Sequence, residues 1–133
     1  MANALFSLGR QGILDRTIDM TGDIRAMLVK STYTFDDNDQ FVSDLGAVDN
    51  GRSAALANKT YALGVFGADN TSLVALAAAA SNAIVLYQYN VADGAARLIA
   101  YIDTPASGLP CTPALGQTIN INWDTGANKI FKL

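Results

Sequence analysis

The segment 83–103 restricts the fold more than any other, because it predicts two strands joined by a sharp reversal. Its arms, 83–89 and 97–102, are rich in the β-branched and aromatic residues that favour strands. Between them, Asp93-Gly94 supplies the positive φ that a tight reversal needs. Side chains alternate along a strand, so the second arm is apolar on both faces. We therefore expect a core against one face and another sheet, a subunit or a partner against the other.

Short runs of strand-forming residues, separated by turn signals, recur along the whole chain. Six of them lie at residues 24–30, 53–57, 60–66, 71–75, 118–123 and 129–133. The alanine run 75–80 favours a helix locally but is too short to be stable alone, so we expect a loop there. Residues 41–45 are expected to form one helical turn. About eight short strands in a single domain, 1–133, predict an all-β sandwich or barrel.

The first fourteen residues are apolar but contain Gly9 and Gly12, which disfavour a helix. We therefore expect an extended N-terminal arm over 1–14, either paired within the chain's own sheet or crossing to a neighbouring subunit. Apolar residues also end the chain, where a free tail would not favour them. The residues predicted to form an interface are Leu5, Phe6, Leu8, Ile130, Phe131 and Leu133.

Charge is sparse and evenly spread. Charged residues make up 16% of the 133 residues, which is typical of a folded chain, and the net charge is −3. The nine basic residues form no stripe that would neutralise phosphates, so we expect no nucleic-acid binding. All twelve acidic residues are aspartates, which favour turns over helix interiors.

No stretch of the sequence predicts export or a membrane span. Residues 1–6 lack the basic region that precedes a secretory apolar run, and the apolar window 73–86 is too short to cross a bilayer. The single cysteine, Cys111, allows neither an internal disulfide nor a thiolate metal cluster. We therefore expect a protein made and kept in a cytoplasm.

Residues that carry chemistry are few, so we predict neither an enzyme nor a cofactor. The chain has no histidine, which removes Ser-His-Asp and Cys-His catalysis. The cluster 36–39 is acidic, but Phe41 and Ala47 stand where an EF-hand needs glycine and glutamate, so a solvated turn is the preferred interpretation over a cation site. Paired aspartates of a glycoside hydrolase would need a proximity that the spacing does not indicate.

Four aromatic residues allow two interpretations. They are Tyr87, Tyr89, Tyr101 and Trp123. Exposed on one face, they would make a platform on which sugars stack, whereas inside the molecule they would pack in the core or pair across strands. Such residues are more often found in cores, and we favour that interpretation.

Several strings at the two ends of the chain carry a family resemblance. They are 1–6, 9–14, 97–104, 108–110, 119–124 and 126–133. Together these strings resemble small structural proteins of tailed bacteriophages, in particular the capsid decoration, or cement, proteins. The middle of the chain is similar only loosely, around 41–45.

The resemblance implies a fold and a role. The fold would be a jelly-roll-like β-sandwich with extended terminal arms, present as a dimer on the outer capsid surface of the virion. The role would be to bind the major capsid protein and stabilise the capsid by bridging its subunits, with no active site. Two alternatives remain open: another virion component, such as a head-completion or tail protein, or a carbohydrate-binding adhesion module.

Overall fold

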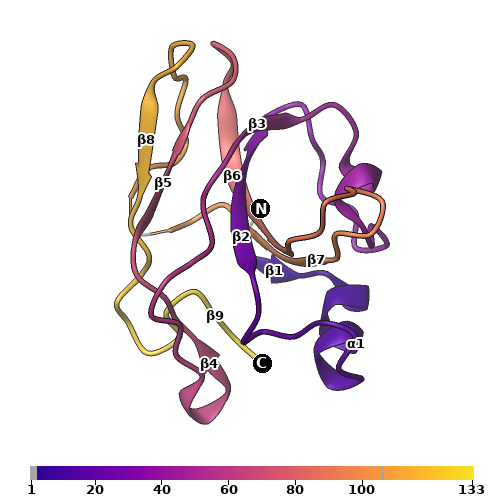
Figure 1. Cartoon of the computed structure of the whole chain (residues 1–133). Helices are drawn as coiled ribbons and strands as arrows, with labels where there is room; N and C mark the ends of the chain where they lie inside the picture. The colour runs from indigo at the N-terminus through magenta and orange to yellow at the C-terminus, as the bar shows by residue number, and fades with distance from the viewer. Residues whose placement is uncertain (1–2, 106) are drawn as a thin grey trace.

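The computed structural model describes residues 3–105 and 107–133, and over them the chain forms nine short strands and little helix (Figure 1). The strands are β1 (Ala4–Leu5), β2 (Ile24–Lys30), β3 (Asp49–Arg52), β4 (Val65–Phe66), β5 (Thr71–Val74), β6 (Ser81–Gln88), β7 (Leu98–Ile102), β8 (Thr118–Ile121) and β9 (Phe131–Lys132). The helical elements are α1 (Ser7–Leu14) and two 3₁₀ turns, η1 (Val42–Leu45) and η2 (Ala62–Gly64).

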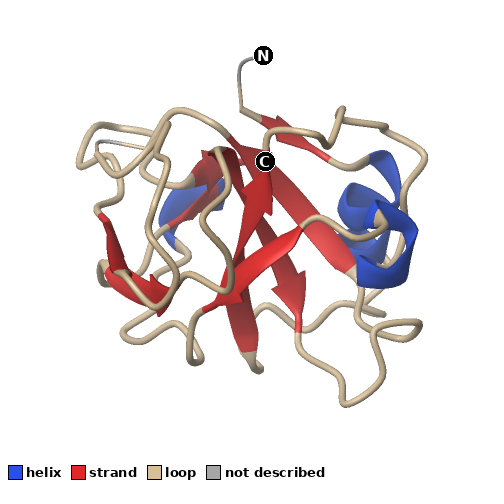
Figure 2. Cartoon of the chain, turned by 90° about the horizontal axis from the view of Figure 1, so that it is seen from above, coloured by secondary structure: helices blue, strands red, loops and turns tan. Residues whose placement is uncertain are grey.

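Every strand pairing is antiparallel, and the strands make one large sheet and two small ones. The large sheet has the order β1-β7-β6-β2-β3, and the small sheets are β4-β9 and β5-β8. Figure 2 shows the strands crossing the middle of the molecule with loops around them. The antiparallel all-β prediction is thus confirmed, while these sheets do not confirm the jelly-roll order. Among the described residues, no helix has the length and apolarity that a membrane crossing needs.

The two strands of the hairpin predicted over 83–103 are confirmed and lie within the large sheet. The positive φ predicted at Asp93-Gly94 is wrong, because neither residue has one and a longer loop makes the reversal. Strands β6 and β7 pair with Val85 opposite Tyr101 and Leu86 opposite Ala100. Its loop is held to β3 by Arg52, whose guanidinium donates two hydrogen bonds to Asp93 at 2.8 and 2.9 Å. These bonds hold the pKa of Asp93 below its usual range.

One face of the large sheet packs on the two small sheets. Residues alternating along β2 and β6, such as Leu28 and Ile84, are fully buried against Leu73 of β5 and Ile121 of β8. Figure 1 shows β5 and β8 standing beside β6 and β2. The alternation predicted for 118–123 is confirmed, because its apolar side chains are buried and its asparagines exposed.

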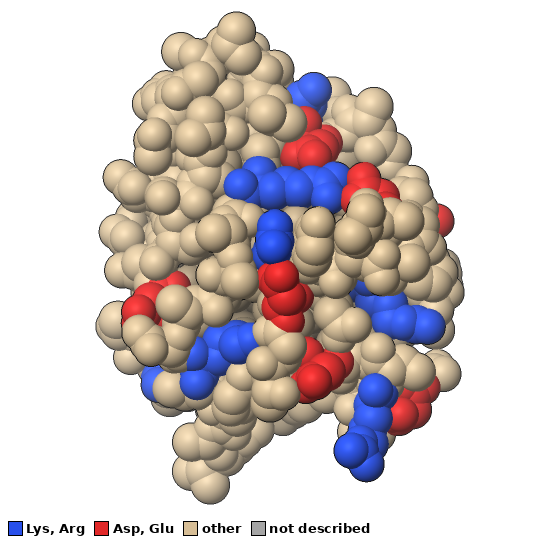
Figure 3. All heavy atoms as spheres, in the orientation of Figure 1, with Lys and Arg blue, Asp and Glu red and all other residues tan. Residues whose placement is uncertain are grey.

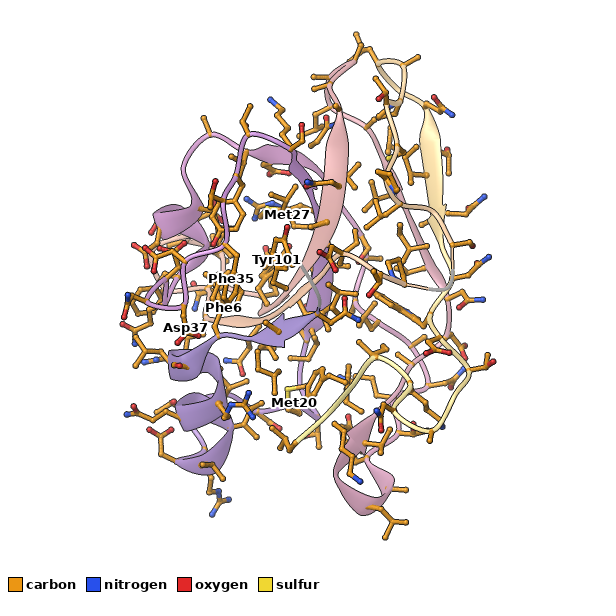
Figure 4. The ribbon with its side chains drawn as sticks, turned by 180° about the vertical axis from the view of Figure 1, so that it is seen from behind. Phe6, Met20, Met27, Phe35, Asp37 and Tyr101 are labelled. Carbon is orange, nitrogen blue, oxygen red and sulfur yellow. The ribbon has the colours of Figure 1, made fainter. Side chains whose placement is uncertain are left out.

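The other face of the large sheet is also covered, and the cover comes from the same chain. The buried side chains of Met27, Val85 and Tyr101 on this face pack with Phe6 and with residues 31–48, a segment of loops and one 3₁₀ turn. Figure 4 shows Phe35 among Phe6, Tyr101 and Met27. Cover on both faces was therefore predicted correctly, but no subunit or partner is needed to supply it.

The extended arm predicted over 1–14 is wrong for most of the described residues. Only Ala4–Leu5 is a strand, paired within the chain to β7, and Ser7–Leu14 is the helix α1. A Cβ atom added at Gly9 would lie 2.6 Å from the carbonyl oxygen of Leu98. Glycine here therefore lets the helix approach the sheet closely instead of breaking the helix.

The strand predicted over 53–57 is also wrong, because β3 occupies Asp49–Arg52, within the stretch expected to turn. Beyond Arg52 the pairing with β2 continues irregularly. The Ser53 amide donates to the Ala26 carbonyl, and the Leu56 amide donates to the Ile24 carbonyl, each at 2.8 Å. The hydroxyl of Ser53 accepts the Ala26 amide at 3.0 Å, which replaces one rung of the ladder.

Candidate interaction surface

The six residues predicted to form an interface have different surroundings. Leu5, Phe6 and Ile130 are buried in the chain's own core, with exposed fractions of 8%, 0% and 4%. Leu8 and Phe131 are half-buried, and Leu133 is 49% exposed. Packing within the chain therefore accounts for the apolar character of most of these residues, and Leu133 alone among them offers a large exposed surface.

Leu133 borders an apolar groove at one end of the molecule. The groove has a volume of about 170 Å³. Its lining residues are Ile13, Met20, Tyr61, Gly64, Val65, Phe66, Phe131 and Leu133. We call this groove the apolar end, together with the exposed residues Leu14 and Leu63, which are next in the chain to the lining residues Ile13 and Gly64.

The wall of the groove formed by β4 and β9 is a stack of aromatic rings. The rings of Phe66 and Phe131 stack at a centroid distance of 5.2 Å, and the ring of Tyr61 lies 5.9 Å from that of Phe66. The Tyr61 hydroxyl donates a hydrogen bond of 2.9 Å to the Met20 carbonyl, which joins this wall to the opposite one. Partial burial raises the pKa of Tyr61 and keeps that donor protonated.

Leu63 projects from the tip of η2 and is 93% exposed. Its backbone is left-handed, with φ 55° and ψ 35°, a conformation that few residues other than glycine adopt. Because left-handed backbone is strained for leucine, its presence at an exposed apolar tip suggests a role beyond folding. In Figure 3 the lower projection, at the place of β4 in Figure 1, carries no charged side chain, and positive and negative side chains lie over the middle and right of this face.

Sequence reasoning missed most of the apolar end. The run 60–66 was predicted as one strand, but it contains the 3₁₀ turn η2 before the short strand β4. Gly64, with φ 78°, is the signal for this turn, since a positive φ interrupts a strand. Leu14, at the end of α1, is 78% exposed and was assigned to an extended arm.

The aromatic residues do not form a platform for sugars. Tyr87, Tyr101 and Trp123 are at most 4% exposed. Tyr89 is 38% exposed, but the Arg25 guanidinium lies over its ring, 3.8 Å from the centroid. The core interpretation of these residues is therefore confirmed for all but Tyr89.

The acidic cluster 36–39 organises the covering segment through hydrogen bonds. Asp37 accepts a bond of 2.9 Å from the Ser7 amide and another from the Ser7 hydroxyl, so it caps the start of α1. Asp39 accepts a bond of 2.8 Å from the Tyr33 hydroxyl, and burial raises the pKa of its carboxyl group. Among the residues that the structure describes, no group of three or more metal-ligating side chains converges.

Calcium is therefore expected to leave the thermal stability unchanged. A site occupied at about a hundred times its dissociation constant would stabilise the folded state by about 2.7 kcal/mol, which is several degrees in melting temperature. We expect a shift of less than about 1 °C when millimolar calcium is added in a thermal melt monitored by circular dichroism. A rise of several degrees, lost in the Asp36→Asn variant, would establish a cation site.

Cys111 is half-buried, and its backbone exchanges two hydrogen bonds with Ser81 at 2.8 and 2.9 Å. Burial raises the pKa of its thiol, which disfavours the reactive thiolate. The position of this cysteine thus suits a packing role.

Comparison with known proteins finds no relative: no protein-family model, no curated protein and no solved structure matches this chain. The surface of the chain and the strings at its ends are the features that bear on its function.

Proposed function

We propose that this chain is a phage capsid decoration protein, which binds the outer surface of the capsid lattice and bridges subunits of the major capsid protein. The observation that carries the proposal is the apolar end, where Leu133 lines an apolar groove and the exposed residues Leu14 and Leu63 are chain neighbours of its lining residues. The resemblance of both ends of the chain to such proteins supports the same role. The virion is then its location, and it acts without catalysis.

A decoration protein needs only a small apolar contact surface, and the apolar end supplies one. Burying a leucine side chain contributes about 1.5–3 kcal/mol, so three exposed leucines at one end supply the core of a small interface. A single contact of this kind is weak, but many copies on a lattice raise the effective affinity. Both faces of the large sheet are covered by the chain itself, so no partner is needed to bury them.

Oligomeric state and copy number separate this role from its nearest alternative. We expect a homodimer, since two-fold pairing is the commonest way for such a module to associate. A decoration protein would be present in hundreds of copies per particle, whereas a head-completion or tail ring holds about six to twelve, as closed symmetry requires. Quantifying the protein against the major capsid protein in purified particles distinguishes the two.

The apolar end is tested by placing a charge on its tip. Replacing Leu63 by glutamate is expected to weaken binding to shells of the encoding phage, stripped of this protein, by at least about tenfold, because a buried leucine is worth about 1.5–3 kcal/mol. Val91→Glu is the matched control, since Val91 is 90% exposed but lies in the β6–β7 loop. Binding is measured by co-sedimentation on a gradient, together with the heat tolerance of the shells.

The outcomes are distinct. If the native protein stays free of stripped shells, the proposed function is wrong. If it binds and both glutamate variants bind equally well, the decoration role stands but the apolar end is not the contact surface. Equal melting temperatures of the two variants exclude loss of folding as the cause of weaker binding.

A further inference from the structure

A second surface lies where two edge strands face the same cleft. Within the part of the chain that the structure describes, strand β1 is an edge of the five-stranded sheet, and β9 pairs with β4 alone. The cleft between them has a volume of about 340 Å³. Residues 3–5 line it on one side and residues 128–132 on the other. The cleft is separate from the apolar groove, although Phe131 contributes to both.

On the β1 side, the backbone of Leu5 faces the cleft. Ala4 lies opposite Tyr101 and Leu5 opposite Ala100, and the next amide, that of Phe6, donates to the Ile99 carbonyl at 3.1 Å. In an antiparallel pair, residues alternate between those that bond to the neighbouring strand and those that do not. Phe6 bonds to β7, so the amide and carbonyl groups of Leu5 point away from it.

On the β9 side, the same alternation leaves Lys132 facing outward. Lys132 lies opposite Val65, and the following amide, that of Leu133, donates to the Gly64 carbonyl at 2.9 Å. The amide and carbonyl groups of Lys132 therefore point away from β4. Unpaired groups on a strand edge are a template for another strand, and here two such edges line one cleft.

The charges around the cleft are mostly positive. Arg10 and Lys132 line it, and neither has an ion pair within residues 3–105 and 107–133. The Lys129 amine lies 3.5 Å from the Thr60 hydroxyl. The one lining carboxylate, that of Asp124, accepts the Gly126 amide at 2.9 Å and so caps its own turn. Two cations that have no ion pair among the described residues, beside open backbone edges, favour an extended segment that carries carboxylates.

We propose that the cleft between β1 and β9 binds an extended acidic segment of a partner protein, which adds as a strand between the two edges. The amide and carbonyl groups of Leu5 and Lys132 would bond to the backbone of the segment, and Arg10 and the Lys132 amine would pair with its carboxylates. This is a second interaction surface beyond the apolar end, and it does not depend on the partner being a capsid.

The probe is a blocked peptide of about seven residues that alternates valine and aspartate, a length that spans one ordinary strand. Titrated into the ¹⁵N-labelled protein, it is expected to shift the amide resonances of Leu5 and Lys132 saturably. A second peptide with lysine in place of aspartate is expected to shift them little. Absence of saturable shifts at these amides, or equal binding of the two peptides, would overturn the proposal.

Two variants at one position separate the backbone contact from the charge. Lys132→Pro removes the outward amide as well as the charge, and Lys132→Ala removes the charge alone; proline is tolerated on a strand edge whose amide points outward. We expect the alanine variant to bind the aspartate peptide a few-fold more weakly than the native protein. The proline variant should bind it about three- to tenfold more weakly still, because it also lacks one hydrogen bond. Lys30→Ala, at the end of β2 and outside the cleft, should bind like the native protein. Native affinity in the proline variant would contradict strand addition, and unchanged resonances in β2 and β6, which do not pair with β9, show that the variant is folded.

Discussion

Replacing Phe6 by alanine is expected to lower the free energy of unfolding by about 3–5 kcal/mol, the cost of truncating a phenylalanine in a packed core. The side chain is fully buried, and its ring lies 5.0 Å from that of Phe35. It packs between the large sheet and residues 31–48, so its loss opens a cavity under the covering segment. The measurement is urea denaturation followed by tryptophan fluorescence.

Leu133→Ala is the matched control at the other end of the chain. Leu133 is 49% exposed, so we expect a stability change within about 0.5 kcal/mol, as for most surface positions. Both residues were predicted from the sequence to serve an interface, and the pair separates the two roles. If the Phe6→Ala protein had native stability but reduced self-association, Phe6 would serve an interface, and its assignment to the core would be wrong.

The central strands could be predicted because each carries its own signal. Strand β2 covers Ile24–Lys30 as expected, and both arms of the hairpin are the strands that their β-branched and aromatic residues predict. Strand β5 and the run 118–123 follow the same rule, since one face of each is buried and the other exposed. Because alternation involves only neighbouring residues, it predicts these strands without knowledge of the tertiary structure.

The cover of the outer sheet face could not be predicted in this way. Apart from the short alternation over 32–35, residues 31–48 have no periodicity. They are anchored by scattered contacts: Phe35 lies 5.3 Å from the Tyr101 ring, and Asp37 binds the start of α1. A two-faced apolar hairpin indicates that cover exists without saying whether it comes from the chain or a partner. Here the chain supplies it, which removes the need for a subunit on that face.

The apolar end could not be predicted from the sequence for a related reason. It joins the end of α1, the turn η2 and strand β9, which are far apart in the sequence and meet only in the fold. Of the residues expected at an interface, Phe131 and Leu133 do lie there. Leu14 and Leu63 were not singled out, because an isolated exposed leucine has no pattern that marks it.

Replacing Gly9 by alanine is expected to destabilise the protein by about 2 kcal/mol, although alanine favours helices over glycine by about 1 kcal/mol. A Cβ atom there would lie 2.6 Å from the Leu98 carbonyl oxygen and 2.8 Å from that of Ile99. Both atoms belong to the backbone of the sheet or its edge and cannot rotate away. Helix α1 would have to move off β7, and thermal or urea denaturation measures the loss.

Gly12→Ala is the matched control within the same helix. Its added Cβ would meet the Ile18 side chain at 2.7 Å, and a side chain can adjust where a carbonyl cannot. The gain in helix propensity then offsets the crowding, and we expect a change within about 1 kcal/mol. If the two variants were equally stable, the close contact of α1 with β7 would not exist, and Gly9 would be a helix breaker in an extended arm, as the sequence alone suggests. A large difference instead establishes that this glycine lets the helix pack on the sheet, so that residues 4–14 belong to the folded domain and do not extend to a neighbour.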